Sequence, residues 1–273
     1  MTRILATLRA ELLIAFRNRW VAIAIAIMAV FSLVLSVTGS APTGALGADP
    51  LTITIASLTS LAVYLVPLIA LLMSFDAVAG EVERGTLPLI LTYPIRRSEI
   101  LAGKFVAHLA TLGLAVGIGY GIAAGVALGS DTGSTAGFPA LLRLFWTSLL
   151  LGAAFLAIGY TLSALARRPG AAAGLVIGLW LVMIVLYDLG LLAAIVADDG
   201  GWFTTDLFPW LLIFNPADAF RLYNLAASEA TAAAAGLGGA ATTIAPVHAL
   251  LSLLLWPVVA FTLAVVAFRK VSP

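Results

Sequence analysis

The chain has 273 residues, of which 62% are hydrophobic and only 10% are charged. A soluble globular domain carries about 25% charged residues, so this composition excludes that class and indicates an integral membrane protein. The net charge of +1 does not point to a nucleic-acid partner, and the absence of cysteine excludes disulfides, thiolate metal sites and cysteine nucleophiles.

Residues 1–19 place apolar side chains on one helical face, at Leu5, Leu8, Leu12 and Phe16. Because the charged side chains lie mostly on other faces, we predict an amphipathic helix at the membrane interface. A cleaved signal peptide is the alternative. The polar segment before the apolar run is too long for a signal peptide. The apolar run itself exceeds the usual limit of about 15 residues, so we expect an uncleaved first span.

Six apolar segments are each near or above the ~20 residues that cross a bilayer as a helix. They are residues 20–37, 51–75, 105–128, 141–166, 171–197 and 246–268. An even number of spans places both termini on one side. All lysines and arginines except Arg143 and Arg221 fall on that side, which makes both termini cytoplasmic. We predict an all-α, polytopic fold with six transmembrane helices in a single domain, residues 1–273.

Residues 76–104 form the one long interval in which charges of both signs gather between apolar segments. Residues 77–84 can continue the second span as a helix that projects into the cytoplasm. Gly85 can end this helix, and residues 86–93 can form a second short one before Pro94. The interval is therefore predicted to be a rigid cytoplasmic loop between the second and third spans.

Three further charged residues lie inside or beside spans. Lys104 begins the third span, where its amine can extend to the lipid headgroups. Asp188 interrupts the fifth span several residues before its end, and a buried acid costs a few kcal/mol unless it is paired or hydrated. We predict an ion pair or a shared water between Asp188 and Arg143 at the outer end of the fourth span, with a polar path as the alternative.

The outer side carries one long loop, residues 198–245, which is acidic and aromatic before it becomes rich in alanine. Asn215, Pro216 and Asp218 are typical of a helix start, with an N-cap, a proline in the first turn and an acid near the helix dipole. The loop is predicted to be either a docking surface for an external protein or a lid. In the docking interpretation, the contact residues are Trp202, Trp210, Asn215, Asp218 and Arg221.

The third span contains glycine at every fourth position, at Gly113, Gly117, Gly121 and Gly125. Small residues at this spacing let a second helix approach closely in a membrane. Packing within one subunit and packing across a moving or dimeric interface both fit this pattern.

Catalytic motifs are absent from the sequence. No phosphate-binding loop, no H-E-x-x-H and no G-x-S-x-G occurs. His108 and His248 are predicted near opposite faces of the membrane, so they cannot share a metal. We expect a chain that is not an enzyme and holds neither a metal nor a cofactor of its own.

The loop sequence E-V-E-R-G-T-L, followed by Y-P-I-R-R-S-E-I-L-A-G-K, resembles the signature of exporter-type ABC permeases. The resemblance implies a permease of the bacterial inner membrane that pairs with a second copy. Each copy would dock a separate cytoplasmic ATPase, which would bind ATP and magnesium. Carried onto this chain, the ATPase-coupling residues are Glu81, Val82, Glu83, Arg84, Gly85 and Thr86. The residues that support the coupling loop are Pro94, Arg97, Gly103 and Lys104.

The outer segment F-N-P-A-D-A-F-R-L, residues 214–222, resembles one type within this family, the permeases that accompany maturation of the copper enzyme nitrous oxide reductase. That resemblance implies a periplasmic protein partner. A copper conduit is disfavoured, because soft ligands beyond Met1 are limited to Met28, Met73 and Met183. Two mechanisms stay open: transmission of ATP-driven motion to the periplasmic partner, or export of a small solute such as a sulfur species or a drug-like or lipid-like substrate.

Overall fold

The computed structural model describes residues 7–9, 11–13, 19–39, 50–129, 135–166, 168–225 and 245–271. Within these residues the chain is helical and contains no strand, which confirms the predicted all-α class. The predicted interfacial helix, residues 1–19, lies largely outside the described residues. Residues 7–9 and 11–13 of it are described, and both stretches are helical.

The long helices are α2 (Arg19–Gly39), α3 (Pro50–Ser74), α6 (Arg97–Leu128), α7 (Phe138–Ala166) and α14 (Pro246–Arg269). A further long helix consists of three parts, α8 (Pro169–Trp180), the π-helix η3 (Leu181–Leu186) and α9 (Tyr187–Asp198). The shorter elements are α4 (Asp76–Glu83), α5 (Thr86–Leu91), η2 (Thr135–Gly137), η4 (Phe203–Leu207), α10 (Phe208–Phe214) and α11 (Pro216–Leu225).

Among the described residues, five helices are long and apolar enough to cross a membrane. They are Leu51–Glu83, Arg97–Leu128, Thr135–Ala166, Pro169–Asp198 and Pro246–Arg269. These helices coincide with the last five predicted spans and confirm that each is a helix long and apolar enough to cross a membrane. Helix α2 lies where the first span was predicted, but its apolar run, Ile25–Leu35, is shorter, so the count of six stays a prediction.

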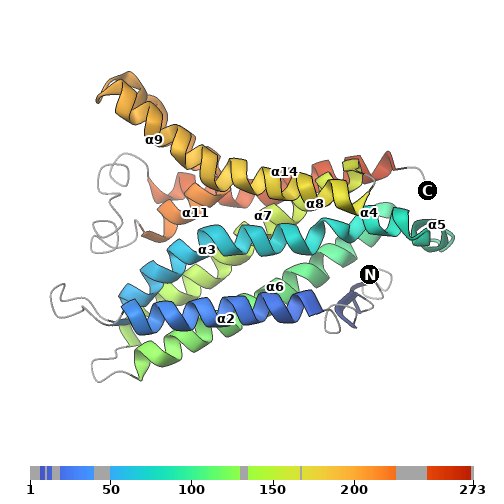
Figure 1. Cartoon of the computed structure of the whole chain (residues 1–273), viewed down its shortest axis with the longest axis horizontal. Coiled ribbons are helices and arrows are strands. Elements are labelled where there is room, and N and C mark those ends of the chain that lie inside the picture. Colours follow the sequence, from blue (N-terminus) through green and yellow to red (C-terminus); the bar gives the residue numbers. More distant parts are fainter. Residues whose placement is uncertain are drawn as a thin grey trace.

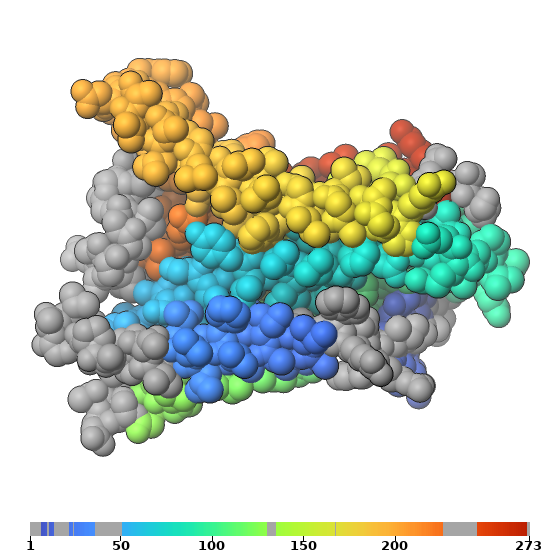
Figure 2. All heavy atoms as spheres, in the orientation of Figure 1, coloured from blue at the N-terminus to red at the C-terminus, as the bar shows by residue number. Residues whose placement is uncertain are grey.

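The long helices run side by side, with α4 and α5 at one end of the bundle and α9 projecting from the other (Figure 1). Helix α2 packs on α6, and both α3 and α14 pack on α7. The helix formed by α8, η3 and α9 lies on the outside of this bundle (Figure 2), and only 11% of its most apolar stretch is buried. Most of the surface of this helix is therefore exposed on the outside of the bundle.

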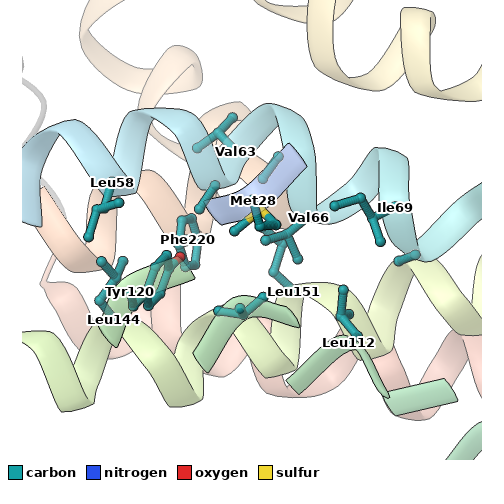
Figure 3. Close-up of a cluster of buried hydrophobic side chains, with 14 of the residues drawn as sticks. Met28, Leu58, Val63, Val66, Ile69, Leu112, Tyr120, Leu144, Leu151 and Phe220 are labelled. Atoms are coloured by element: carbon teal, nitrogen blue, oxygen red, sulfur yellow. The ribbon is translucent and has the colours of Figure 1, made fainter. Parts of the chain in front are cut away.

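The main hydrophobic core lies where α2, α3, α6, α7 and α11 meet (Figure 3). Met28 of α2 and Phe220 of α11 are both fully buried in it. The Tyr120 hydroxyl lies 2.8 Å from Ser148 Oγ, so these two buried polar groups are paired with each other. Because Phe220 enters the core, α11 is an integral part of the bundle.

Close contact between α2 and α6 depends on Gly119, which the predicted glycine stripe did not include. A Cβ atom at Gly119 would lie 3.2 Å from the Met28 carbonyl oxygen. Within the stripe, Gly113 and Gly117 face side chains of α7, whereas an added Cβ at Gly121 or Gly125 would meet nothing within 4 Å. The stripe therefore packs within the subunit over only half of its length.

Replacing Gly119 with valine is expected to destabilise the purified protein by about 1–3 kcal/mol, because the new side chain meets the backbone of α2. Thermal unfolding in detergent measures the loss. Gly121→Val is the matched control on the same helix, and it should change stability little. Equal losses for the two variants would contradict this packing.

Candidate functional site

Helix α4 follows α3 after a turn at Phe75, and a residue of α7 holds its start. The backbone amides of Val78 and Ala79 donate hydrogen bonds to Ser163 Oγ of α7, at 3.1 and 3.0 Å. Ser163 is fully buried. Because a buried amide needs an acceptor, this serine fixes the start of α4 on α7.

The chain reverses direction between α4 and α5 at Gly85, whose φ of 66° lies in the left-handed region that favours glycine. The α4–α5 turn, residues 76–91, exposes Glu83, Arg84 and Gly85 at its tip. Leu89 and Tyr93 next to the tip are 65% and 66% exposed. The turn therefore presents a small surface of mixed charged and apolar character at one end of the bundle (Figure 1).

Glu81 lies on the opposite side of α4, where it joins a buried group that we call the Lys104 cluster: Glu11, Glu81 and Lys104. The Lys104 ammonium lies 2.5 Å from Glu11 Oε1 and 2.7 Å from Glu81 Oε1. Lys104 is only 6% exposed, so the prediction that its amine extends to the headgroups is wrong. Two carboxylates from neighbouring elements hold the amine inside the protein.

The other predicted support residues occupy different environments. Arg97 donates hydrogen bonds to the carbonyls of Phe268 and Val271 at 2.8 and 2.5 Å, so it binds the backbone at and just beyond the end of α14. Its guanidinium also lies 5.6 Å from the centre of the Phe268 ring. Gly103 is buried in α6, whereas Pro94 is exposed in the segment before it.

The segment of α10 and α11 binds η3 and the start of α9 through polar side chains. Asn215 donates a hydrogen bond from Nδ2 to the Met183 carbonyl at 2.7 Å, and its Oδ1 accepts one from the Ala217 amide at 3.0 Å. The Tyr187 hydroxyl donates to the Leu211 carbonyl at 2.7 Å. Asn215 therefore caps α11, as predicted from the sequence, and also binds η3.

Arg221 of α11 completes this contact. It lies 2.6 Å from Asp188 of α9 and 3.1 Å from Asp218 of its own helix. The predicted direct pair between Arg143 and Asp188 is therefore wrong, because α11 folds back and brings Arg221 to the acid. The Nε atom of Arg143 is buried and has no hydrogen-bond partner among the described residues.

The docking surface predicted on the outer loop is only partly available. Trp202 and Trp210 are 68% and 57% exposed, as a contact surface requires. Asn215 and Asp218 are buried, and Arg221 is bound to two carboxylates. Since these three side chains face the bundle, their predicted role as partner contacts is wrong for this conformation.

Nothing in the described part of the chain gathers three side chains of the kinds that bind a metal. His108 bonds through Nδ1 to the Tyr160 hydroxyl at 2.7 Å, and His248 packs against Trp210. Met28 lies inside the hydrophobic core, and Met73 and Met183 pack against it. The methionines therefore serve as core residues here, as the sequence led us to expect.

The sequence did not point to Ser163 or Glu11 as parts of this arrangement. Ser163 is one of several hydroxyl residues within spans, and nothing local distinguishes it. Glu11 does carry a signal, because it is the only acidic residue among positions 1–19, which otherwise contain several arginines. A lone acid in a basic segment indicates a specific cationic partner elsewhere in the chain.

Burial raises the pKa of Asp218 to about 8, and nearby Asp188 adds to this effect while Arg221 opposes it. Helix α11 is not among the candidate membrane spans. Asp218 Oδ2 is also buried without a hydrogen-bond partner among the described residues. Two carboxylates thus share one guanidinium, and a proton on Asp218 balances their charge near neutral pH.

Residues 5–272 match the sequence profile of a protein family that is described as "ABC-2 family transporter protein". The chain is 42% identical over 266 residues to a probable ABC transporter permease protein NosY of Stutzerimonas stutzeri, and the match covers 96% of each chain. It is also 42% identical over 265 residues to a protein of the same description from Pseudomonas aeruginosa strain PAO1, again over 96% of each chain.

The raised pKa of Asp218 predicts that the protein loses stability as the pH rises from about 4 towards about 8, because the folded state keeps a proton that the unfolded state releases. The slope is at most ~1.4 kcal/mol per pH unit. Thermal unfolding across this pH range measures the slope.

Asp218→Asn should remove most of this slope, since asparagine cannot titrate. Asp188→Asn serves as the comparison: it removes the negative charge that pairs with Arg221 at 2.6 Å and should lower stability. An Asp218→Asn variant with an unchanged slope would contradict the assignment of the proton to Asp218.

Proposed function

Since this chain belongs to the ABC-2 family of transporter proteins and is a NosY-like permease subunit, we propose that the α4–α5 turn docks a separate cytoplasmic ATPase. Two copies of the permease pair, and each couples ATP hydrolysis on its ATPase to movement across the bacterial inner membrane. Both termini and the turn lie on the cytoplasmic side. ATP and magnesium bind to the ATPase subunit.

The observation that carries this proposal is the division of the turn into an exposed and a buried side. Glu83, Arg84 and Gly85 form an exposed tip beside exposed Leu89 and Tyr93. An interface gains affinity from such exposed aromatic and apolar groups ringed by charge. The ATPase contact therefore falls on the Glu83 side of α4, and Glu81 acts within the permease.

At the other end of the bundle, the exposed aromatic residues Trp202 and Trp210 support a periplasmic protein partner. They follow α9, which α11 binds through Arg221 and Asp188. Movement of α11 and α9 would thus be transmitted directly to the surface formed by Trp202 and Trp210. Together with the resemblance of residues 214–222, this arrangement supports transmission of motion to a periplasmic protein in copper-site maturation of nitrous oxide reductase.

Glu83→Lys is expected to weaken association with the ATPase about ten-fold or more, which corresponds to roughly 1.4 kcal/mol or more. The charge at the exposed tip is reversed, while the buried contacts of α4 stay intact. Copurification of the ATPase with the tagged permease measures the effect. Asp206→Lys is the matched control, since it makes the same charge change at an exposed position near the opposite end of the bundle.

Full ATPase recovery with Glu83→Lys would show that the turn is not the docking element. Recovery of a periplasmic protein with the wild-type permease should fall when Trp202 and Trp210 are both replaced by alanine. If wild-type permease recovers the ATPase but no periplasmic protein, export of a small solute becomes the better account.

A further inference from the structure

The Lys104 cluster joins three elements that are far apart in the sequence. Glu11 comes from the N-terminal segment, Glu81 from α4 and Lys104 from the first third of α6. The side chains of all three are largely buried, at 16%, 10% and 8% exposed. A single ammonium therefore connects the helix that carries the exposed tip to two other parts of the subunit.

The charges of this cluster do not balance. One carboxylate is enough to neutralise Lys104, and the neutral pair of Lys104 and Glu81 already satisfies the usual requirement for burying a charge. Glu11 adds a second carboxylate. When all three side chains are ionised, the Lys104 cluster therefore carries one excess negative charge. Burial of that excess opposes stability, so the need for stability alone does not explain Glu11.

A second contact shows that α4 is held from both sides. Ser163 of α7 accepts hydrogen bonds from the amides at the start of α4, and the Lys104 cluster holds the helix near its end at Glu81. Ala77 and Val78 of α4 also pack in a small hydrophobic cluster with residues of α14. The position of the exposed tip therefore depends on α7, on α6 and, through Glu11, on the N-terminal segment.

We propose that Lys104 is a positioning residue, which ties α4 to the N-terminal segment through Glu81 and Glu11 so that both move together when the ATPase acts. This inference rests on the proposed function of the α4–α5 turn. In it, Glu11 contributes to transmission of motion rather than to folding or to ATPase binding. Glu81 and Lys104 contribute to both transmission and stability.

The test measures transmission without knowledge of any substrate. Because the chain has no cysteine, Asp206→Cys gives a single site for a fluorescent label near the end opposite to the α4–α5 turn. The labelled permease is reconstituted in nanodiscs with the ATPase subunit that copurifies with it. The measurements are ATPase binding, the rate of ATP hydrolysis and the change in label fluorescence on addition of ATP and Mg²⁺.

Glu11→Ala is expected to keep ATPase binding, ATP hydrolysis and thermal stability close to wild type, and to lose most of the ATP-dependent fluorescence change. Arg9→Ala is the matched control, because Arg9 is exposed on the same segment, and it should keep the full signal. Lys104→Arg should also keep the signal, since arginine can bind two carboxylates, whereas Lys104→Met should lose both signal and stability.

A charge exchange then tests direct contact. Glu11→Lys and Lys104→Glu should each lose the signal alone, and the double variant should regain it, because one ammonium again faces two carboxylates. A full signal in Glu11→Ala, or no recovery in the double variant, would overturn the inference while leaving the proposed function intact. Failure of the wild-type permease to bind an ATPase would instead reject the proposed function.

Discussion

A bilayer offers no hydrogen-bond partners to a polar group, so each buried polar side chain of this chain needs a partner within the protein. Only 10% of the residues are charged, and several buried polar contacts join different helices and fix their positions. Ser163 fixes the start of α4, Lys104 fixes its end, and Asn215 and Arg221 fix α11 against η3 and α9.

Helix α7 takes part in the polar contacts at both ends of the bundle. Ser163 binds α4, and Thr147 accepts a hydrogen bond from Asn224 of α11 at 3.0 Å. These two residues are about 24 Å apart along a helix with a rise of 1.5 Å per residue. The α4–α5 turn and the α10–α11 helices therefore share one rigid, largely buried support, which is a suitable arrangement for relating movement at one end to movement at the other.

The sequence predicted the helices well because a membrane span requires a long apolar run, which is a local property. It also predicted the turn at Gly85 and the cap at Asn215, since both follow from neighbouring residues. It failed where the partner is distant. The prediction paired Asp188 with Arg143 because both were placed on the outer side. It exposed Arg221 because the helix that begins after Asn215 was expected to project from the outer loop. Only the return of α11 into the core, through Phe220, reverses both assignments.

The π-helical segment Leu181–Leu186 determines which way the following helix, α9, faces. A π-turn corresponds to one residue inserted into an α-helix, and one residue rotates everything that follows by about 100°. Without the insertion, Asp188 would point away from Arg221 and the Met183 carbonyl would return to the regular helical pattern. The contact between α9 and α11 is thus a matter of helical register, and a lineage of such permeases could acquire or lose it through a single-codon insertion or deletion.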